Sequence, residues 1–381
     1  MEEIRNFFES DNEENMNIEN DENNEDIEME NVSNNEESIE SEINEPFKYN
    51  EGDFEKDKIF KFLCDNNILL QNPIYEKCNK IMKLSKNKKR IDGKIWRCTK
   101  KGANKHDNKI NIRAGSIFEN IKADIRIHYF LLFYNFVENK SINESYNNSI
   151  EFCKQLKLEF ITKKLVSKFY LQIRKKIMIK MHKNWENNPL GVEPCINGKS
   201  YCEIDESKII NYENQTRWMF GIYDRGTKDV RIFFVDNNRT KETLLPIVKA
   251  NIYSVYQHLD SNEEPNHDSY PTRIFSDCFQ TYRVGDFNQL GFILHKVNHS
   301  IWFGQGHFHT NSIEGTWSKL KRLTKSFTDL NGNIFNTKKN IEDKEYFDGW
   351  ICTGIFFMKC ESLNLSYNAK KNYLISFVTL S

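Results

Sequence analysis

The sequence has no apolar run long enough to cross a membrane. Its longest nearly unbroken apolar stretch covers residues 127–137, about half of the roughly 20 residues that a spanning helix needs. The first twenty residues are acidic and rich in Asn, and they lack the basic start and apolar core of a secretory signal. We therefore expect a protein without a membrane span that stays inside the cell.

The sequence also lacks an even, regularly spaced set of cysteines that could form disulfides. The nine cysteines are an odd number, and they are scattered from Cys64 to Cys360. This usage is typical of reduced thiols in a reducing compartment and fits a disulfide framework poorly. It therefore favours an intracellular protein over one that disulfides hold together.

Basic residues are almost absent from the first fifty positions, which contain 18 Asp and Glu against only Arg5 and Lys48. Such a composition buries too little apolar area to offset the entropy of the chain. Residues 1–55 are therefore predicted to form a disordered acidic tail. The tail either keeps the protein soluble or competes with nucleic acid for the basic part of the chain.

The positive charge that balances this tail is concentrated in one region. Residues 77–190 contain 27 Lys and Arg against 9 Asp and Glu. This asymmetry indicates a body that meets a polyanion, either nucleic acid or a membrane surface.

After the tail, about 330 residues remain, enough for two or three domains at roughly 100 to 200 residues each. Two amphipathic segments, 145–156 and 161–181, have the size of a helix-turn-helix pair. The second segment carries the charge of a helix that docks in a DNA groove, although a solvated basic face would look the same. The basic residues that suggest this are Lys163, Lys164, Lys168, Arg174, Lys175 and Lys176. The predicted regions are 1–55 (tail), 56–116 (small irregular module), 117–190 (helical, with a buried helix at 117–137), 191–330 (alternating strands and helices) and 331–381 (C-terminal tail).

Residues 191–330 differ in pattern from the helical region before them, and the boundary lies near Pro189 and Pro194. Strand-like runs alternate there with helical spacing, and this order predicts an α/β layer with a mixed sheet. The predicted strands are 201–205, 217–223, 230–235, 273–277 and 291–295, and the predicted helices are 240–259, a short one before 291, and 311–325.

Two acids end predicted strands, Asp205 and Asp277, and Glu314 lies in the first turn of the last helix. Side chains at strand ends leave the core while the backbone stays rigid, so ligands and metals are held there. Three carboxylates suit a pair of Mg²⁺ ions that supports an in-line phosphoryl displacement. Each acid also has a structural interpretation: Asp205 starting a loop, Asp277 capping a helix, and Glu314 forming a capping box with Asn311.

Residues near Glu314 add two further hypotheses. Lys321 lies two turns later on the same helical stripe, where a cation would contact a phosphate. Three histidines, His299, His307 and His309, offer an alternative zinc site, but their spacing matches no closed zinc site.

These motifs, taken in order, resemble the catalytic domain of Merlin-type DDE transposases and their ISXO-type insertion-sequence relatives. The resemblance covers about residues 90–325. It is carried by Glu203-Ile204-Asp205-Glu206-Ser207, Trp218-Met219-Phe220-Gly221, Phe275-Ser276-Asp277 with Tyr282, Val297-Asn298-His299-Ser300, His309-Thr310-Asn311-Ser312-Ile313-Glu314-Gly315-Thr316-Trp317, and Lys319-Leu320-Lys321.

The resemblance implies a ribonuclease-H-like fold and an enzyme, a DNA nuclease and strand transferase. It would cleave and transfer transposon ends with Mg²⁺, or Mn²⁺ as an alternative. Asp205, Asp277 and Glu314 would be the catalytic and metal-binding acids and Lys321 the basic residue after them, and Asn311 would share or replace the role of Glu314. The implied partners are double-stranded DNA, as terminal inverted repeats and target, and further copies of the chain. The alternative is a catalytically inactive, domesticated DNA-binding descendant, and a eukaryotic host would imply a nuclear location.

The family usually carries a zinc ribbon before its helix-turn-helix, and this chain departs from that pattern. Cys78 and Cys98 fall at expected positions, but Tyr75 stands where a second cysteine would complete a Cys-x-x-Cys pair. We therefore expect a degenerate zinc-ribbon-like module without metal. A site made of Cys78, Cys98, His106 and Cys64 remains an alternative.

Overall fold

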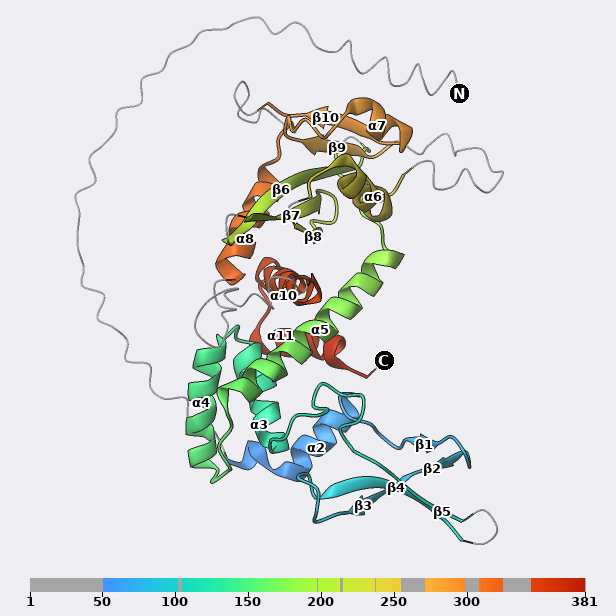
Figure 1. The fold of residues 1–381 in the computed structure, drawn as a ribbon, viewed down its shortest axis with the longest axis vertical. Coiled ribbons are helices and arrows are strands. Elements are labelled where there is room, and N and C mark those ends of the chain that lie inside the picture. The colour runs from blue at the N-terminus through green and yellow to red at the C-terminus, as the bar shows by residue number, and fades with distance from the viewer. Residues whose placement is uncertain are drawn as a thin grey trace, which may run out of the picture. The chain divides into compact units, whose positions relative to one another are not determined.

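The structure is a computed structural model, and it describes residues 51–101, 105–196, 198–212, 215–236, 238–254, 271–298, 308–324 and 344–380 (Figure 1). Most of the predicted acidic tail lies outside these ranges. Its last residues do not: Glu51–Phe54 forms a short 3-10 helix, η1, and Phe54 is buried among aromatic rings. None of the helices in the described ranges combines the length and the apolarity that crossing a membrane requires.

A small antiparallel module follows helix α2 (Lys56–Asp65). It contains a hairpin of β1 (Ile74–Tyr75) and β2 (Lys80–Ile81) and a sheet of order β3-β4-β5. The three strands of this sheet are β3 (Lys83–Lys86), β4 (Lys94–Lys100) and β5 (His106–Ile110). Met82, Trp96, Cys98 and Ile112 form its small core.

The helical region begins later than the apolar pattern predicts. Asp124 caps α3 (Ile125–Phe130) by accepting a hydrogen bond from the Arg126 amide, and α3 continues into a π-helical turn, η2 (Leu131–Phe136). The predicted single helix over 117–137 is therefore wrong for its first eight residues, which form turns.

The predicted helix pair is present as α4 (Ile142–Gln155) and α5 (Lys163–Asn187). Ser141 and Glu144 form a capping box at the start of α4, so two amides are satisfied reciprocally. Thr162 caps α5 by accepting from the Leu165 amide.

The predicted mixed α/β sheet is confirmed. Its five strands are ordered β10-β9-β6-β7-β8. β6 to β8 are antiparallel neighbours, whereas β9 is parallel to β6 and β10 is parallel to β9. The strands are β6 (Tyr201–Tyr212), β7 (Gln215–Asp224), β8 (Val230–Asp236), β9 (Arg273–Ser276) and β10 (Ile293–Lys296).

Helices cover both faces of this sheet. Alternate side chains of a strand point to opposite faces, and Cys202 and Ile204 pack with residues of α6 (Lys241–Asn251) and α7 (Val284–Gln289) in one core. α8 (Asn311–Thr324) packs against β6 and β7. Glu203 and Asp205 contact α8, so they lie on the face opposite to α6.

Two predicted elements have other bounds in the structure. The first strand does not stop at Asp205 but continues to Tyr212, because it pairs with β7 along its length. Helix α6 ends at Asn251 and not at 259, because the buried Ile252 becomes extended and forms a bridge with Leu190.

The C-terminal region contains two helices, α10 (Lys344–Ser362) and α11 (Tyr367–Val378). α10 contacts α5, α8 and β8, so it connects the helical region to the large sheet (Figure 1). Phe347 stacks on Phe234 of β8 with ring centroids 4.4 Å apart, and Phe357 packs 5.7 Å from Phe136.

Candidate functional site

The two predicted strand-end acids lie on neighbouring parallel strands. β6 pairs with β9 in a register that places Glu203 opposite Phe275. Asp205 follows Glu203 by two residues within β6, and Asp277 follows Phe275 by two residues, directly after the end of β9. Neighbouring strands are about 4.8 Å apart. The fold therefore brings Asp205 and Asp277 to the same edge of the sheet.

Helix α8 presents the third acid to this edge. The indole nitrogen of Trp317 donates to Asp205 Oδ2 at 2.8 Å, which fixes the orientation of that carboxylate. Glu314 lies one turn earlier on α8, is exposed, and accepts a hydrogen bond from the Thr310 hydroxyl at 2.9 Å. A spacing of three residues puts Glu314 and Trp317 on one helix face, so Glu314 points toward the end where Asp205 and Asp277 lie.

The capping-box interpretation of Asn311 and Glu314 is wrong. Asn311 is the first residue of α8, and the Glu314 amide bonds to the carbonyl of Thr310. The capping carboxylate comes from another element: Glu203 Oε2 accepts from the amides of Ser312 and Ile313 at 3.0 and 2.9 Å. A carboxylate at a helix N-terminus is stabilised by the unpaired amides and by the helix dipole.

A buried arginine completes this anchor. Glu203 is fully buried, and its Oε1 accepts from Arg225 Nε at 2.6 Å. Arg225 also donates to the carbonyl of His309 at 2.5 Å, just before α8 begins. Glu203 and Arg225 therefore hold α8 against the sheet, which leaves Asp205, two residues along the strand, for another role.

The three predicted acids interact electrostatically. Burial, together with the charges of Asp277 and Glu314, raises the pKa of Asp205 to about 6, although the Trp317 hydrogen bond opposes this shift. The neighbouring Glu206 behaves in the same way: burial and then the charges of Asp205 and Asp277 raise its pKa to about 8. Negative charge thus accumulates here beyond what the protein compensates.

Arg239 offsets part of the charge of Glu206. Its Nη1 lies 3.8 Å from Glu206 Oε2 and lowers the pKa of Glu206 against burial and the acidic neighbours, while the guanidinium stacks over the ring of Trp218 at 3.6 Å. Glu206 Oε1 is buried and has no hydrogen-bond partner among the described residues.

The donor set at this edge fits hard divalent cations. Oxygen ligands with surplus negative charge are what Mg²⁺ and Mn²⁺ select. The three acids do not form a closed cage. Among the described residues, only Cys78, Cys98 and His106 form a group of three His, Cys, Asp or Glu side chains whose ligand atoms all lie within 4.8 Å of one another.

Other predicted residues lie near the site or beyond the described ranges. Lys321 is exposed in the last turn of α8, and Asn311 is exposed at its first. His299 and His307 of the alternative zinc site lie outside the described residues. His309 Nδ1 faces the Asn311 amide and Arg225 Nη2, each at 3.3 Å, so this nitrogen acts as an acceptor within the protein.

Several residues of the site were not singled out from the sequence. Glu203, Glu206 and Trp317 belong to the motifs that carry the resemblance but have no predicted role, and nothing in the sequence marks Arg225. The alternation of β6 would have placed Glu203 on the same face as Asp205. No sequence signal would have paired Arg225 with the start of α8.

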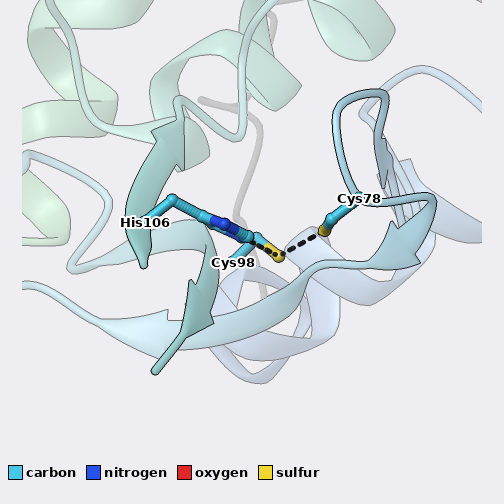
Figure 2. Close-up of side chains that lie close together, drawn as sticks. All are labelled: Cys78, Cys98 and His106. Carbon is cyan, nitrogen blue, oxygen red and sulfur yellow. Dashed lines mark hydrogen bonds between the residues drawn. The ribbon is translucent and has the colours of Figure 1, made fainter. Parts of the chain in front are cut away.

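A second cluster lies in the small N-terminal module (Figure 2). Cys98 Sγ is 3.5 Å from Cys78 Sγ and 3.3 Å from His106 Nε2. Cys64, the fourth residue considered, points elsewhere, because its thiol donates to the carbonyl of Leu70 at 3.7 Å. Burial and the neighbouring Cys78 raise the pKa of the Cys98 thiol.

Comparison with known proteins does not assign this arrangement of residues to a family. No protein-family model matches the chain, and no curated protein matches it. The function must therefore be argued from the residues themselves.

Proposed function

We propose that the chain is a DDE-type transposase that cleaves DNA strands and transfers them at transposon ends. The observation that carries this proposal is that Asp205, hydrogen-bonded to Trp317 of α8, lies near enough to Asp277 and Glu314 for their charges to raise its pKa. These are also the residues that the resemblance to Merlin-type and ISXO-type transposases marks as the catalytic acids. The assignment therefore has two sources, the geometry and the ordered motifs.

The topology of the sheet supports a ribonuclease-H-like fold for this region. Three antiparallel strands are followed by two parallel ones, and the first strand lies at the centre of the order β10-β9-β6-β7-β8. Such a sheet places the ends of the central strand and of its parallel neighbour side by side. Asp277 directly follows the parallel neighbour β9, and Asp205 lies within the central strand β6.

The chemistry asked of the protein is mainly positioning and charge stabilisation. Bound Mg²⁺ or Mn²⁺ would activate the attacking oxygen and stabilise the leaving one. Asp205, Asp277 and Glu314 would hold the cations, and Trp317 keeps Asp205 in one orientation. Lys321 would face a phosphate of the bound strand. No side-chain nucleophile is needed, because the attacking group is water and then a DNA 3′-hydroxyl.

The DNA partner is proposed from the charge of residues 77–190 and the helix pair α4 and α5. Recognition helices contact bases mainly through their first residues, and Lys163 and Lys164 lie in the first turn of α5. A homo-oligomeric assembly and, in a eukaryotic host, a nuclear location are part of the same proposal.

The test is a cleavage and strand-transfer assay on DNA duplexes from the sequences that flank the gene, with Mg²⁺, Mn²⁺ or EDTA. We expect Asp205→Asn and Asp277→Asn each to lower cleavage on the order of a thousandfold, because several kcal/mol of transition-state stabilisation are lost. DNA binding in EDTA should stay unchanged. Asp229→Asn is the matched control, since this carboxylate pairs with Lys359 on the surface.

The competing function is a DNA-binding protein that has lost catalysis. It predicts unchanged DNA affinity in all variants and no cleavage by the natural chain with either cation. Full activity of Asp205→Asn or Asp277→Asn would instead reject the assigned acids.

A further inference from the structure

The cluster of Cys78, Cys98 and His106, called the Cys78 cluster below, is formed by three separate segments of the chain. Cys78 lies in the turn between β1 and β2, Cys98 in the middle of β4, and His106 at the first position of β5. Two thiols and an imidazole lie within 4.8 Å of one another, and Cys98 is buried (Figure 2). Soft sulfur and imidazole ligands together favour zinc over Mg²⁺.

The distances match the edge lengths of a tetrahedral zinc site. Zinc binds sulfur at about 2.3 Å and nitrogen at about 2.0 Å, so two sulfurs are about 3.8 Å apart and sulfur and nitrogen about 3.5 Å. The observed distances are 3.5 Å between Cys78 and Cys98 and 3.3 Å between Cys98 and His106. A disulfide requires about 2.05 Å between the sulfurs, so this pair is not bridged.

The turn that carries Cys78 is already shaped to present its thiol. The amides of Cys78 and Asn79 both donate to the carbonyl of Tyr75, at 3.1 and 2.8 Å. Asn79 adopts a left-handed conformation with φ of 51°, which closes the turn. This geometry exists although Tyr75 cannot supply the second sulfur.

Tyr75 stands where a zinc ribbon would have a cysteine ligand, and it contributes an aromatic ring in place of a sulfur. Its ring lies 5.0 Å from the ring of His106, so it packs beside the cluster. Cys64 is the other cysteine of this module, and it bonds elsewhere. The protein therefore provides three ligands and an aromatic wall.

The hairpin that carries Cys78 has little else to hold it. β1 and β2 have two residues each, and Ile74, Lys80 and Ile81 are exposed. Isolated hairpins are marginal in water, and small modules often depend on a metal. A cation at the cluster would tie this hairpin to β4 and β5.

We propose that Cys78, Cys98 and His106 bind one zinc ion through three protein ligands and leave its fourth position to water. This replaces the sequence-based expectation of a metal-free module. It also differs from a closed zinc ribbon, which has four protein ligands, and it stands independently of the proposed catalytic function.

The first experiment measures zinc in the full-length chain. After reduction, treatment with one equivalent of zinc and removal of free metal, elemental analysis should find about one zinc per chain. Cys78→Ser and His106→Asn should each lose this zinc, whereas Cys278→Ser, an exposed cysteine elsewhere, should retain it. The proposal is overturned if the natural chain holds no zinc, or if the Cys78→Ser/Cys98→Ser double variant holds as much as the natural chain.

The second experiment tests the open position with Co²⁺ in place of zinc. The natural chain should show tetrahedral visible bands and a thiolate charge-transfer band from two sulfurs. Tyr75→Cys should raise that band in the ratio of three sulfurs to two and slow metal loss to a chelator. An unchanged spectrum in Tyr75→Cys would overturn the open position. A Cys78–Cys98 disulfide in protein prepared without reductant, together with no bound metal, would overturn the site.

Discussion

Glu203 and Asp205 lie on the same face of β6, but their hydrogen-bond and ion-pair partners give the two carboxylates different roles. Glu203 is neutralised by Arg225 and by two helix amides, so its charge serves to anchor α8. Asp205, two residues later, accepts from the Trp317 indole and the Glu206 backbone, but burial and the charges of Asp277 and Glu314 still raise its pKa. Buried charge that the protein leaves uncompensated is a mark of a functional site.

Gly221 allows the contact that orients Asp205. It is the register partner of Asp205 on β7, and a methyl group added there would lie 2.6 Å from the Trp317 ring. We predict that Gly221→Ala lowers the free energy of unfolding by about 1–3 kcal/mol through overpacking. The displaced indole should also reduce cleavage. Urea unfolding and the cleavage assay measure the two effects.

Gly285→Ala is the control for this substitution, because a methyl group at Gly285 meets no atom within 4 Å. Gly285 lies inside α7, so alanine should stabilise the protein by up to about 1 kcal/mol. Equal destabilisation by both substitutions would contradict the role of the Gly221 and Trp317 contact.

The start of α3 is an element whose stability should depend on pH. Burial raises the pKa of Asp124, but the hydrogen bonds from Arg126 and the charge of Lys56 outweigh it and lower the pKa to about 2. The unfolded value is about 3.9. The charged carboxylate therefore stabilises the protein above about pH 4, and this contribution is lost as the pH falls toward 2.

We predict that Asp124→Asn lowers the free energy of unfolding by about 1–2 kcal/mol at pH 7, because the charged hydrogen bonds are lost. The difference from the natural chain should shrink as the pH falls below 4. Urea unfolding over this pH range measures it. Asp65→Asn is the control, since this exposed carboxylate pairs only with Lys61 and should cost under about 1 kcal/mol. A constant difference at all pH values would contradict the prediction.

The basic face assigned to α5 is only partly available to DNA. Arg174 is buried, and Lys175 forms an ion pair with Glu345 of α10 at 2.6 Å. Lys168 donates to the carbonyl of Asn120. The interpretation of all six basic residues as a groove-docked face is therefore wrong for Arg174. The first turn of the helix, with Lys163 and Lys164, remains.

Substitution of Lys163 and Lys164 by Ala should weaken DNA binding and lower the slope of log affinity against log salt by about 2. Lys175→Ala should leave both quantities nearly unchanged, because its charge is already paired within the protein. Fluorescence anisotropy at several salt concentrations measures them. Equal effects of the two changes would show that charge acts without regard to position on α5.

Across the whole molecule, the sequence predicts the features that depend on local residue patterns, such as the strands of the large sheet. Period-two alternation and turn residues located the strands of the large sheet, and their ends marked Asp205 and Asp277. The partners of these acids could not be predicted, because Arg225, Trp317 and Glu206 meet them only through tertiary packing. The sequence predicts a module without metal because Tyr75 stands where a second cysteine is expected, and spacing alone does not show that Cys98 and His106 lie together on adjacent strands.

The sequence predicts a mixed C-terminal tail that packs on the large sheet, and the helices α10 and α11 of this region also contact α5. Phe347 is fully buried and stacks on Phe234 of β8, while other residues of α10 pack on α5. We predict that Phe347→Ala lowers the free energy of unfolding by about 3–5 kcal/mol. Glu345→Ala, which removes only a surface ion pair on the same helix, should cost under about 1 kcal/mol.

Because α10 contacts both α5 and β8, its loss should affect the two regions together. Unfolding followed separately by Trp fluorescence and by far-ultraviolet circular dichroism should give coincident transitions in the natural chain and in Phe347→Ala. If the sheet and the helices unfolded in separate steps, α10 would be an attachment to independent domains. Coincident transitions would instead show that residues 344–380 belong to the same cooperative unit as the large sheet and α5.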